Sequence, residues 1–182
     1  TLFITHNGLY LRFKTAEIPT VGAKASGVKG INLKEDYVIY AATIKEEDEY
    51  LNAFTNFKTG KRLKLNDLVL ITRAKKGNML FKKAKTKDYK IDFAYLSNSK
   101  DTNLCKVEND IKEIKNSEIP IMDMASTGSN ITKENVNLWA LKAQEIDLLN
   151  RNKEQKEENK IIEEKKESEQ LSFASFVEDF KI

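Results

Sequence analysis

A stretch near the start of the chain returns later and sets the organisation of the sequence. Residues 17–31 read Glu-Ile-Pro-Thr-Val-Gly-Ala-Lys-Ala-Ser-Gly-Val-Lys-Gly-Ile, and Glu-Ile-Pro occurs again at residues 118–120. A glycine follows each copy, at Gly27 and Gly128, and Gly77 lies between them at spacings of 50 and 51 residues. This recurrence predicts about three units of about 50 residues each. Their expected bounds are 1–48, 49–101 and 102–133.

The units read as strands joined by turns. Thr1–Thr5 and Leu9–Phe13 are rich in β-branched and aromatic residues, and Asn7-Gly8 between them is a strong hairpin signal. Further strand candidates are Asp36–Ile44, Leu68–Thr72, Asn78–Phe81 and Ile91–Leu96. No segment before about residue 134 has the 3.6-residue periodicity of an amphipathic helix. Because a unit of this size cannot bury both sheet faces alone, we predict an all-β, propeller-like fold of about three four-stranded blades.

The charge is unevenly distributed along the chain of 182 residues. Residues 1–100 hold 19 Lys and Arg against 10 Asp and Glu, whereas residues 101–182 hold 12 against 18. A basic body followed by an acidic tail is typical of proteins with a polyanionic partner, although a lysine-rich solvated surface gives the same counts. No apolar run approaches the length of a membrane-spanning helix, and no secretory signal is visible, so we expect no membrane partner.

The sequence offers little material for catalysis or metal binding. Cys105 is the single cysteine, which excludes an internal disulfide, and we expect it in the core or at its edge. His6 is the single histidine and adjoins a turn signal. The glycines of residues 22–30 fit turns better than a phosphate loop, and the acidic run 46–49 fits a solvated turn better than a cation site. We expect no catalytic residue, metal ligand or cofactor in this chain.

The last fifty residues differ from the repeated units. In residues 134–150 the apolar side chains near Trp139 recur at helical spacing, which predicts a helix that packs on the last blade. Residues 151–182 read as a charged linker that ends in a short aromatic segment. The charged part is either a solvated helix or disordered, and we favour partial disorder. The aromatic segment is a candidate contact for a protein partner through Phe173, Phe176, Val177 and Phe180.

Residues 12–36 resemble the repeat of the C-terminal domain of bacterial type IIA topoisomerase A subunits, a family that includes the A subunits of gyrase and of topoisomerase IV. The shared features are Arg12-Phe13, the Glu-Ile-Pro segment, and Gly-Val-Lys-Gly-Ile-Asn-Leu at residues 27–33 before an acidic turn. The resemblance is clearest in the first unit, less complete in the second and degenerate in the third. The Gln-Arg-Arg-Gly-Gly-Lys-Gly box, which gyrase carries in its first blade, does not occur in these residues. This favours the topoisomerase IV branch, unless that blade lies upstream of Thr1.

The resemblance implies a β-pinwheel, a propeller-like disc with a basic rim, and a non-catalytic domain that binds and bends double-stranded DNA. The parent enzyme would decatenate chromosomes and relax supercoils, with its ATP and Mg on other domains or subunits. Further implied partners are the catalytic domains of the same polypeptide and the ATPase B subunit, in the cytoplasm beside the bacterial nucleoid. The DNA-wrapping domain of gyrase is one alternative, and a propeller-like protein-interaction module is another.

Basic residues near the ends of the predicted strands are the candidate DNA contacts. A rim of this kind would bind phosphates without reading bases, so low sequence specificity and a steep salt dependence are expected. Arg12 and Arg73 are the foremost candidates because each lies within the repeated element. The full set of candidates is Arg12, Lys14, Lys24, Lys29, Lys58, Lys61, Arg62, Lys64, Arg73, Lys75, Lys76, Lys82 and Lys83.

Overall fold

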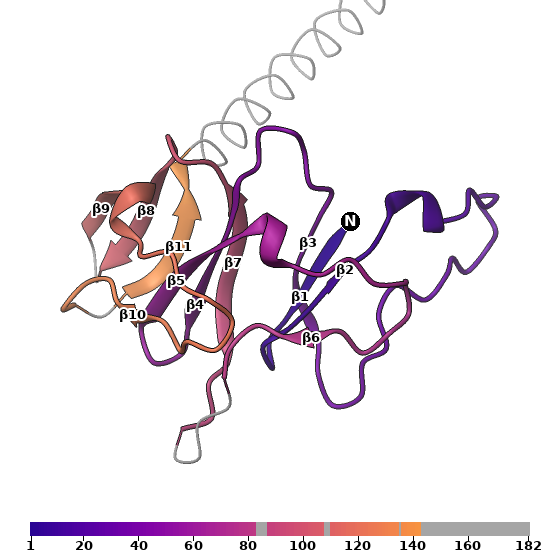
Figure 1. The fold of residues 1–182 in the computed structure, drawn as a ribbon, viewed down its shortest axis with the longest axis horizontal. Coiled ribbons are helices and arrows are strands. Elements are labelled where there is room, and N and C mark those ends of the chain that lie inside the picture. Colours follow the sequence, from indigo (N-terminus) through magenta and orange to yellow (C-terminus); the bar gives the residue numbers. More distant parts are fainter. Residues whose placement is uncertain (83–86, 108–109, 135, 143–182) are drawn as a thin grey trace, which may run out of the picture. The chain divides into compact units, whose positions relative to one another are not determined.

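The computed structural model describes residues 1–82, 87–107, 110–134 and 136–142, which form three antiparallel sheets (Figure 1). The strands are β1 (Leu2–Thr5), β2 (Leu9–Arg12), β3 (Val38–Ala42), β4 (Tyr50–Thr55), β5 (Thr59–Lys64), β6 (Asn78–Met79), β7 (Ile91–Ser97), β8 (Thr102–Val107), β9 (Asp110–Lys115), β10 (Ser129–Asn130) and β11 (Val136–Leu141). Single turns of 3-10 helix follow the second strand of each unit, as η1 (Thr15–Glu17), η2 (Leu65–Asp67) and η3 (Asn116–Glu118).

Each of the first two sheets takes its outer strand from the following unit. The strand orders are β3-β1-β2-β6, β10-β5-β4-β7 and β11-β8-β9. Strand β6 belongs to the second unit but pairs with β2, and β10 belongs to the third unit but pairs with β5. The all-β blade architecture is therefore confirmed, and the exchange of outer strands is an addition to it. Within the described residues the third blade has three strands, where four were expected.

The recurring glycine lets each outer strand approach the preceding blade. Gly77 has φ +89°, and a Cβ built on it would lie 2.5 Å from the main-chain oxygen of Tyr10. Gly128 has φ +83°, and a Cβ there would lie 3.0 Å from the oxygen of Gly60. Left-handed φ and close backbone contact both favour glycine. This explains why a glycine returns at the same place in consecutive units.

Apolar side chains fill the space between neighbouring blades. Between the first and second blades, Leu2, Leu51 and Leu65 are buried in one cluster. Between the second and third blades, Phe54 stacks on Trp139 with ring centroids 4.0 Å apart. Cys105 lies fully buried in the same cluster, as predicted for a core cysteine, and burial raises the pKa of its thiol.

A buried polar network adjoins this second interface. The strand registers and the 3-10 turns place Asn52, Asn103 and Asn116 where the first interface has Leu2, Leu51 and Leu65. The side-chain nitrogen of Asn52 donates to the side-chain oxygens of Asn103 and Asn116 at 2.9 and 2.8 Å. Ser97 donates its hydroxyl to the oxygen of Asn52 at 2.9 Å. The polar groups of this interface therefore satisfy one another through direct hydrogen bonds.

Two sequence predictions fail in the described residues. Residues 136–141 form strand β11 and not the start of a helix, so the third blade extends past residue 133. Successive side chains of this strand lie on opposite faces of the sheet, so Trp139 is buried and Leu138 is exposed. Leu68–Thr72 makes only an isolated bridge, between Leu70 and Arg12. The rest of the predicted helix and the charged aromatic tail lie outside the described residues. Among the residues that the structure describes, no helix is long and apolar enough to cross a membrane.

Candidate functional site

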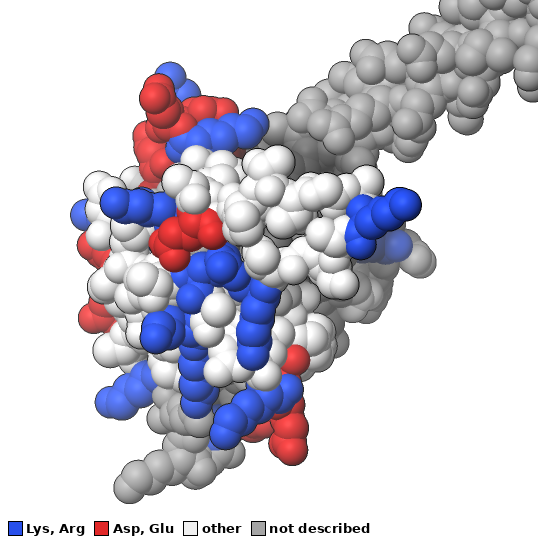
Figure 2. Space-filling view, turned by 90° about the vertical axis from the view of Figure 1, so that its right-hand side faces the viewer, with Lys and Arg blue, Asp and Glu red and all other residues white. Residues whose placement is uncertain are grey.

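The predicted basic residues divide into two groups by where their side chains lie. Figure 2 shows Lys and Arg side chains gathered on the face at the right-hand side of Figure 1, where the loops beside the first blade lie. Lys83 lies outside the described residues. The exposed group is Lys14, Lys24, Lys29, Lys58, Lys64, Lys75, Lys76 and Lys82, and the inward group is Arg12, Lys61, Arg62 and Arg73.

Arg12 and Arg62 hold consecutive units together at equivalent positions. The guanidinium of Arg12 donates to the main-chain oxygens of Leu65 and Leu68 at 2.6 and 3.1 Å, across the turn η2. Arg62 donates from Nε to the oxygen of Ile119 at 2.6 Å, just after the turn η3. Each arginine thus satisfies carbonyls of the next unit, and burial lowers the pKa of Arg62.

The third unit breaks this pattern. Glu113 occupies the position of Arg12 and Arg62, because it pairs across the hairpin with Leu104 and lies three residues before η3. Its carboxylate forms an ion pair with Lys142. A carboxylate has no proton to give at neutral pH, so it cannot bind carbonyl oxygens as the two arginines do.

Lys61 is fully buried, with no exposed surface. Its ammonium donates to the main-chain oxygens of Leu80, Asp123 and Ser126 at 2.8, 2.7 and 2.9 Å. It also lies 4.2 Å from the ring centroid of Phe81. Burial lowers the pKa of Lys61 to about 8, and the nearby Asp123 carboxylate opposes that shift. Lys61 therefore fastens the loop before β10 to the second blade.

Arg73 connects two loops in the same inward manner. Its main-chain nitrogen donates to the Glu17 carboxylate at 2.8 Å, and Nε donates to the Glu17 main-chain oxygen at 3.1 Å. A third bond runs from Nη1 to the oxygen of Lys29. The prediction of surface phosphate contacts is contradicted for Lys61 and Arg62 by their burial, while Arg12 and Arg73 direct their guanidinium groups to carbonyls. For the exposed lysines it stays a prediction.

Main-chain bonds bring exposed lysines of two units side by side. The nitrogen of Ala74 donates to the oxygen of Gly30 at 2.8 Å, and the nitrogen of Asn32 donates to the oxygen of Lys75 at 2.9 Å. The loop that carries Lys24 and Lys29 is thereby held against the loop that carries Lys75 and Lys76. Fixed cations of this kind on one face produce a positive field that attracts an extended anion.

The set of candidate DNA contacts drawn from the sequence leaves out three lysines that lie near this region. Lys34, Lys87 and Lys90 line a hollow of about 630 Å³ together with Lys76 and Lys82. Lys34 lies in the acidic turn that ends the stretch resembling the repeat, and Lys87 and Lys90 lie outside that stretch on either side of Asp88 and Tyr89. Only the fold brings them together.

The described residues show little sign of a catalytic centre. Among them, no group of three or more His, Cys, Asp or Glu side chains is placed to hold a metal ion. His6 lies at the first hairpin turn, as predicted, where its ring stacks on Tyr37 at 4.8 Å and its Nδ1 contacts the oxygen of Ile91 at 3.1 Å. These contacts account for the single histidine as a structural residue.

Comparison with known proteins agrees with the blade architecture. Residues 1–45 and 50–92 match the family model described as the DNA gyrase C-terminal domain, a beta-propeller. The chain belongs to this family. A crystal structure of the C-terminal domain of DNA topoisomerase IV superposes with a TM-score of 0.68 and 31% identity, over 77% of this chain and 45% of that one. The structure of the DNA gyrase A C-terminal domain, at TM-score 0.61 and 17% identity over 77% of this chain and 49% of that one, shares the fold.

The curated relatives are larger proteins. The A subunit of DNA topoisomerase 4 from Bacillus subtilis is 32% identical over 126 residues, which is 69% of this chain but 16% of that protein. The protein of the same name from Streptococcus pneumoniae is 34% identical over 93 residues, 51% of this chain and 11% of that protein. The β-pinwheel family named from residues 12–36 is thus confirmed, and the chain spans only a small part of these relatives.

Proposed function

We propose that this chain is the DNA-binding domain of a type IIA topoisomerase of the topoisomerase IV kind, within its A subunit. The observation that carries the proposal is the junction of the loops 22–30 and 74–76, which sets exposed lysines of two consecutive units beside one another. The names of the relatives support this family context, and those at 32% and 34% identity are topoisomerase 4 subunits.

The expected mechanism is backbone recognition. Lysine ammonium groups are compact charges on flexible stems, which suits phosphates and gives no reading of base edges. Each neutralised phosphate releases counterions, so binding should weaken steeply as salt rises. The domain would then hold and bend duplex DNA for the catalytic part of the same polypeptide and for its ATPase partner, with ATP and Mg bound elsewhere, in the bacterial cytoplasm.

A salt titration of duplex binding tests the proposal. Fluorescence anisotropy of a labelled duplex is measured for the full chain, for Lys75→Glu/Lys76→Glu, and for Lys45→Glu/Lys100→Glu as a control with the same charge change. All four lysines are exposed. We expect the slope of log affinity against log salt to fall by about 2 in the first variant, at about 0.9 per lost phosphate contact. The control should lose much less.

The alternatives give different results. If the full chain does not bind duplex DNA in 50 mM salt, the DNA-binding proposal is wrong and a protein-interaction module becomes the better interpretation. If both variants lose the same affinity, the junction of the two loops is not the contact surface, and only net charge matters.

A further inference from the structure

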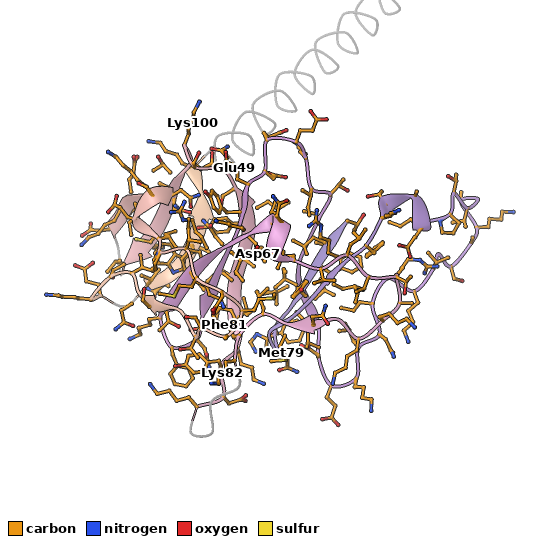
Figure 3. All side chains as sticks on the ribbon, viewed as in Figure 1. Glu49, Asp67, Met79, Phe81, Lys82 and Lys100 are labelled. Atoms are coloured by element: carbon orange, nitrogen blue, oxygen red, sulfur yellow. The ribbon has the colours of Figure 1, made fainter. Side chains whose placement is uncertain are left out.

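A hollow beside the first hairpin collects residues from several separate stretches of the chain. Its volume is about 630 Å³, and Leu9, Met79 and Phe81 contribute apolar side chains to its lining. Met79, Phe81 and Lys82 lie near one another on the lower side of the view in Figure 3, where the chain leaves β6. The hollow therefore adjoins the exchanged outer strand, which is the element that couples the first two blades.

Five lysines line this hollow, which we call the lysine hollow: Lys34, Lys76, Lys82, Lys87 and Lys90. The carboxylates in its lining belong to Glu35, Asp36 and Asp88. One oxygen of Asp36 accepts the main-chain nitrogens of Asn7 and Tyr37 at 3.0 and 2.8 Å, so that carboxylate closes a turn. Asp88 lies 3.1 Å from Lys90. Five amines therefore face three carboxylates, of which Asp88 is paired with Lys90, while the second oxygen of Asp36 is buried with no hydrogen-bond partner among the described residues.

Contacts within the protein restrain the amine of Lys90 firmly and that of Lys87 more loosely before any ligand arrives. The ammonium of Lys90 donates to the side-chain oxygen of Asn7 at 2.6 Å, and its side chain is only 27% exposed. The ammonium of Lys87 lies 5.2 Å from the ring centroid of Phe57. Ordering a lysine side chain on binding costs conformational entropy. A lysine that is already ordered loses less conformational entropy on binding, so more of its electrostatic attraction to the ligand appears as binding free energy.

We propose that the lysine hollow seats one sugar–phosphate strand of the duplex that this domain binds. Several amines from separate loops offer more than one cation to the negative charges of a backbone, and the apolar side chains in the lining suit the carbon face of the sugars. Lys76 belongs both to the hollow and to the paired loops, so the seat continues the positive surface described above. This inference rests on the proposed function and adds Lys34, Lys87 and Lys90 to its contact residues.

Amine footprinting on the unaltered full chain tests the seat directly. Exposed lysines are acetylated at low reagent concentration, with and without a saturating duplex, and the modification is located by mass spectrometry. We expect several-fold protection of Lys34 and Lys87 by duplex and none of Lys100, which lies at the opposite side of the view in Figure 3. Inorganic phosphate alone is the second arm. If it protects Lys34 and Lys87 as well as duplex does, the hollow binds a free anion and the proposal is overturned.

Matched variants provide a second measurement. Lys34→Glu/Lys87→Glu is compared with Lys45→Glu/Lys100→Glu in duplex binding, after circular dichroism shows that both are folded. We expect about tenfold or greater loss of affinity in the hollow variant and a salt slope lower by about 2. A hollow variant that binds like the control, while the unaltered chain binds duplex, would reject the seat but leave DNA binding intact. No binding by the unaltered chain would reject both.

Discussion

Gly77 and Gly27 occupy equivalent places in their units, yet their surroundings differ. Both have left-handed φ, at +89° and +78°. A Cβ on Gly77 would press on the main-chain oxygen of Tyr10 at 2.5 Å, whereas a Cβ on Gly27 would meet nothing within 4 Å. The backbone conformation is thus shared by the repeat, while the close contact exists only where an outer strand pairs with a preceding blade.

This difference predicts unequal costs for the same substitution. Gly27→Ala should lower the free energy of unfolding by about 1–2 kcal/mol, the cost of left-handed φ for a residue with a Cβ. Gly77→Ala should cost more than about 3 kcal/mol, since the outer strand must also move away from β2. Urea denaturation of both variants measures the two values. Equal losses would show that the contact with Tyr10 carries no energy.

Because of Lys61, we expect the free energy of unfolding of the domain to change with pH in the alkaline range. Its folded pKa of about 8 lies below the ordinary lysine value, so between these two pH values the unfolded chain binds more protons than the folded one. Stability contributed by this group therefore rises as pH increases through that window. Relative to Lys61→Met, the unaltered chain should gain up to about 3 kcal/mol of unfolding free energy between pH 7 and pH 10. A difference that is constant with pH would contradict this assignment.

At the scale of elements, the residue after each 3-10 turn is buried only where a preceding blade packs against it. Leu68 and Ile119 follow η2 and η3 and are 1% and 0% exposed, because each packs into the preceding blade. Ile18 follows η1 and is 43% exposed. The same residue class at the same repeat position thus faces either a core or solvent, depending on whether a preceding hairpin covers it in this structure.

Truncation of these side chains should separate the two environments. Leu68→Ala should cost about 2–5 kcal/mol of unfolding free energy, as for a buried leucine that leaves a cavity. Ile18→Ala should change it by less than about 0.5 kcal/mol, as for an exposed position. Thermal unfolding of the full chain compares the two. A large loss from Ile18→Ala would mean that another part of the protein covers this residue in solution.

Local signals in the sequence reveal the hairpins and the period, but not the exchange between units. Asn7-Gly8 and the recurring glycines identify turns because turn geometry depends on a few adjacent residues. The outer strands β6 and β10 are two residues long, and although Asn78–Phe81 reads as a strand, no local signal indicates that its partner is β2 of the preceding unit. The regular spacing of Arg12 and Arg62 fits phosphate contacts as well as it fits contacts within the protein. The structure is needed to show that their partners are main-chain carbonyls.

At the scale of the whole molecule, exchanged strands couple the blades. Strand β6 ties the second unit to the first blade, β10 ties the third unit to the second, and the arginine contacts follow the same order. A blade cannot unfold alone without removing a strand from its neighbour. Nearest-neighbour coupling of this strength favours a single unfolding transition over stepwise loss of blades.

The single tryptophan offers a local test of that coupling. Trp139 is in the third blade and stacks on Phe54 of the second, so its fluorescence reports on a site remote in sequence from Leu68. Leu68→Ala, at the first interface, should shift the urea midpoint of Trp139 fluorescence as much as that of the far-ultraviolet circular dichroism, because one transition unfolds all three sheets. A shift seen in circular dichroism alone would instead mean that the last two blades remain folded together after the first has opened.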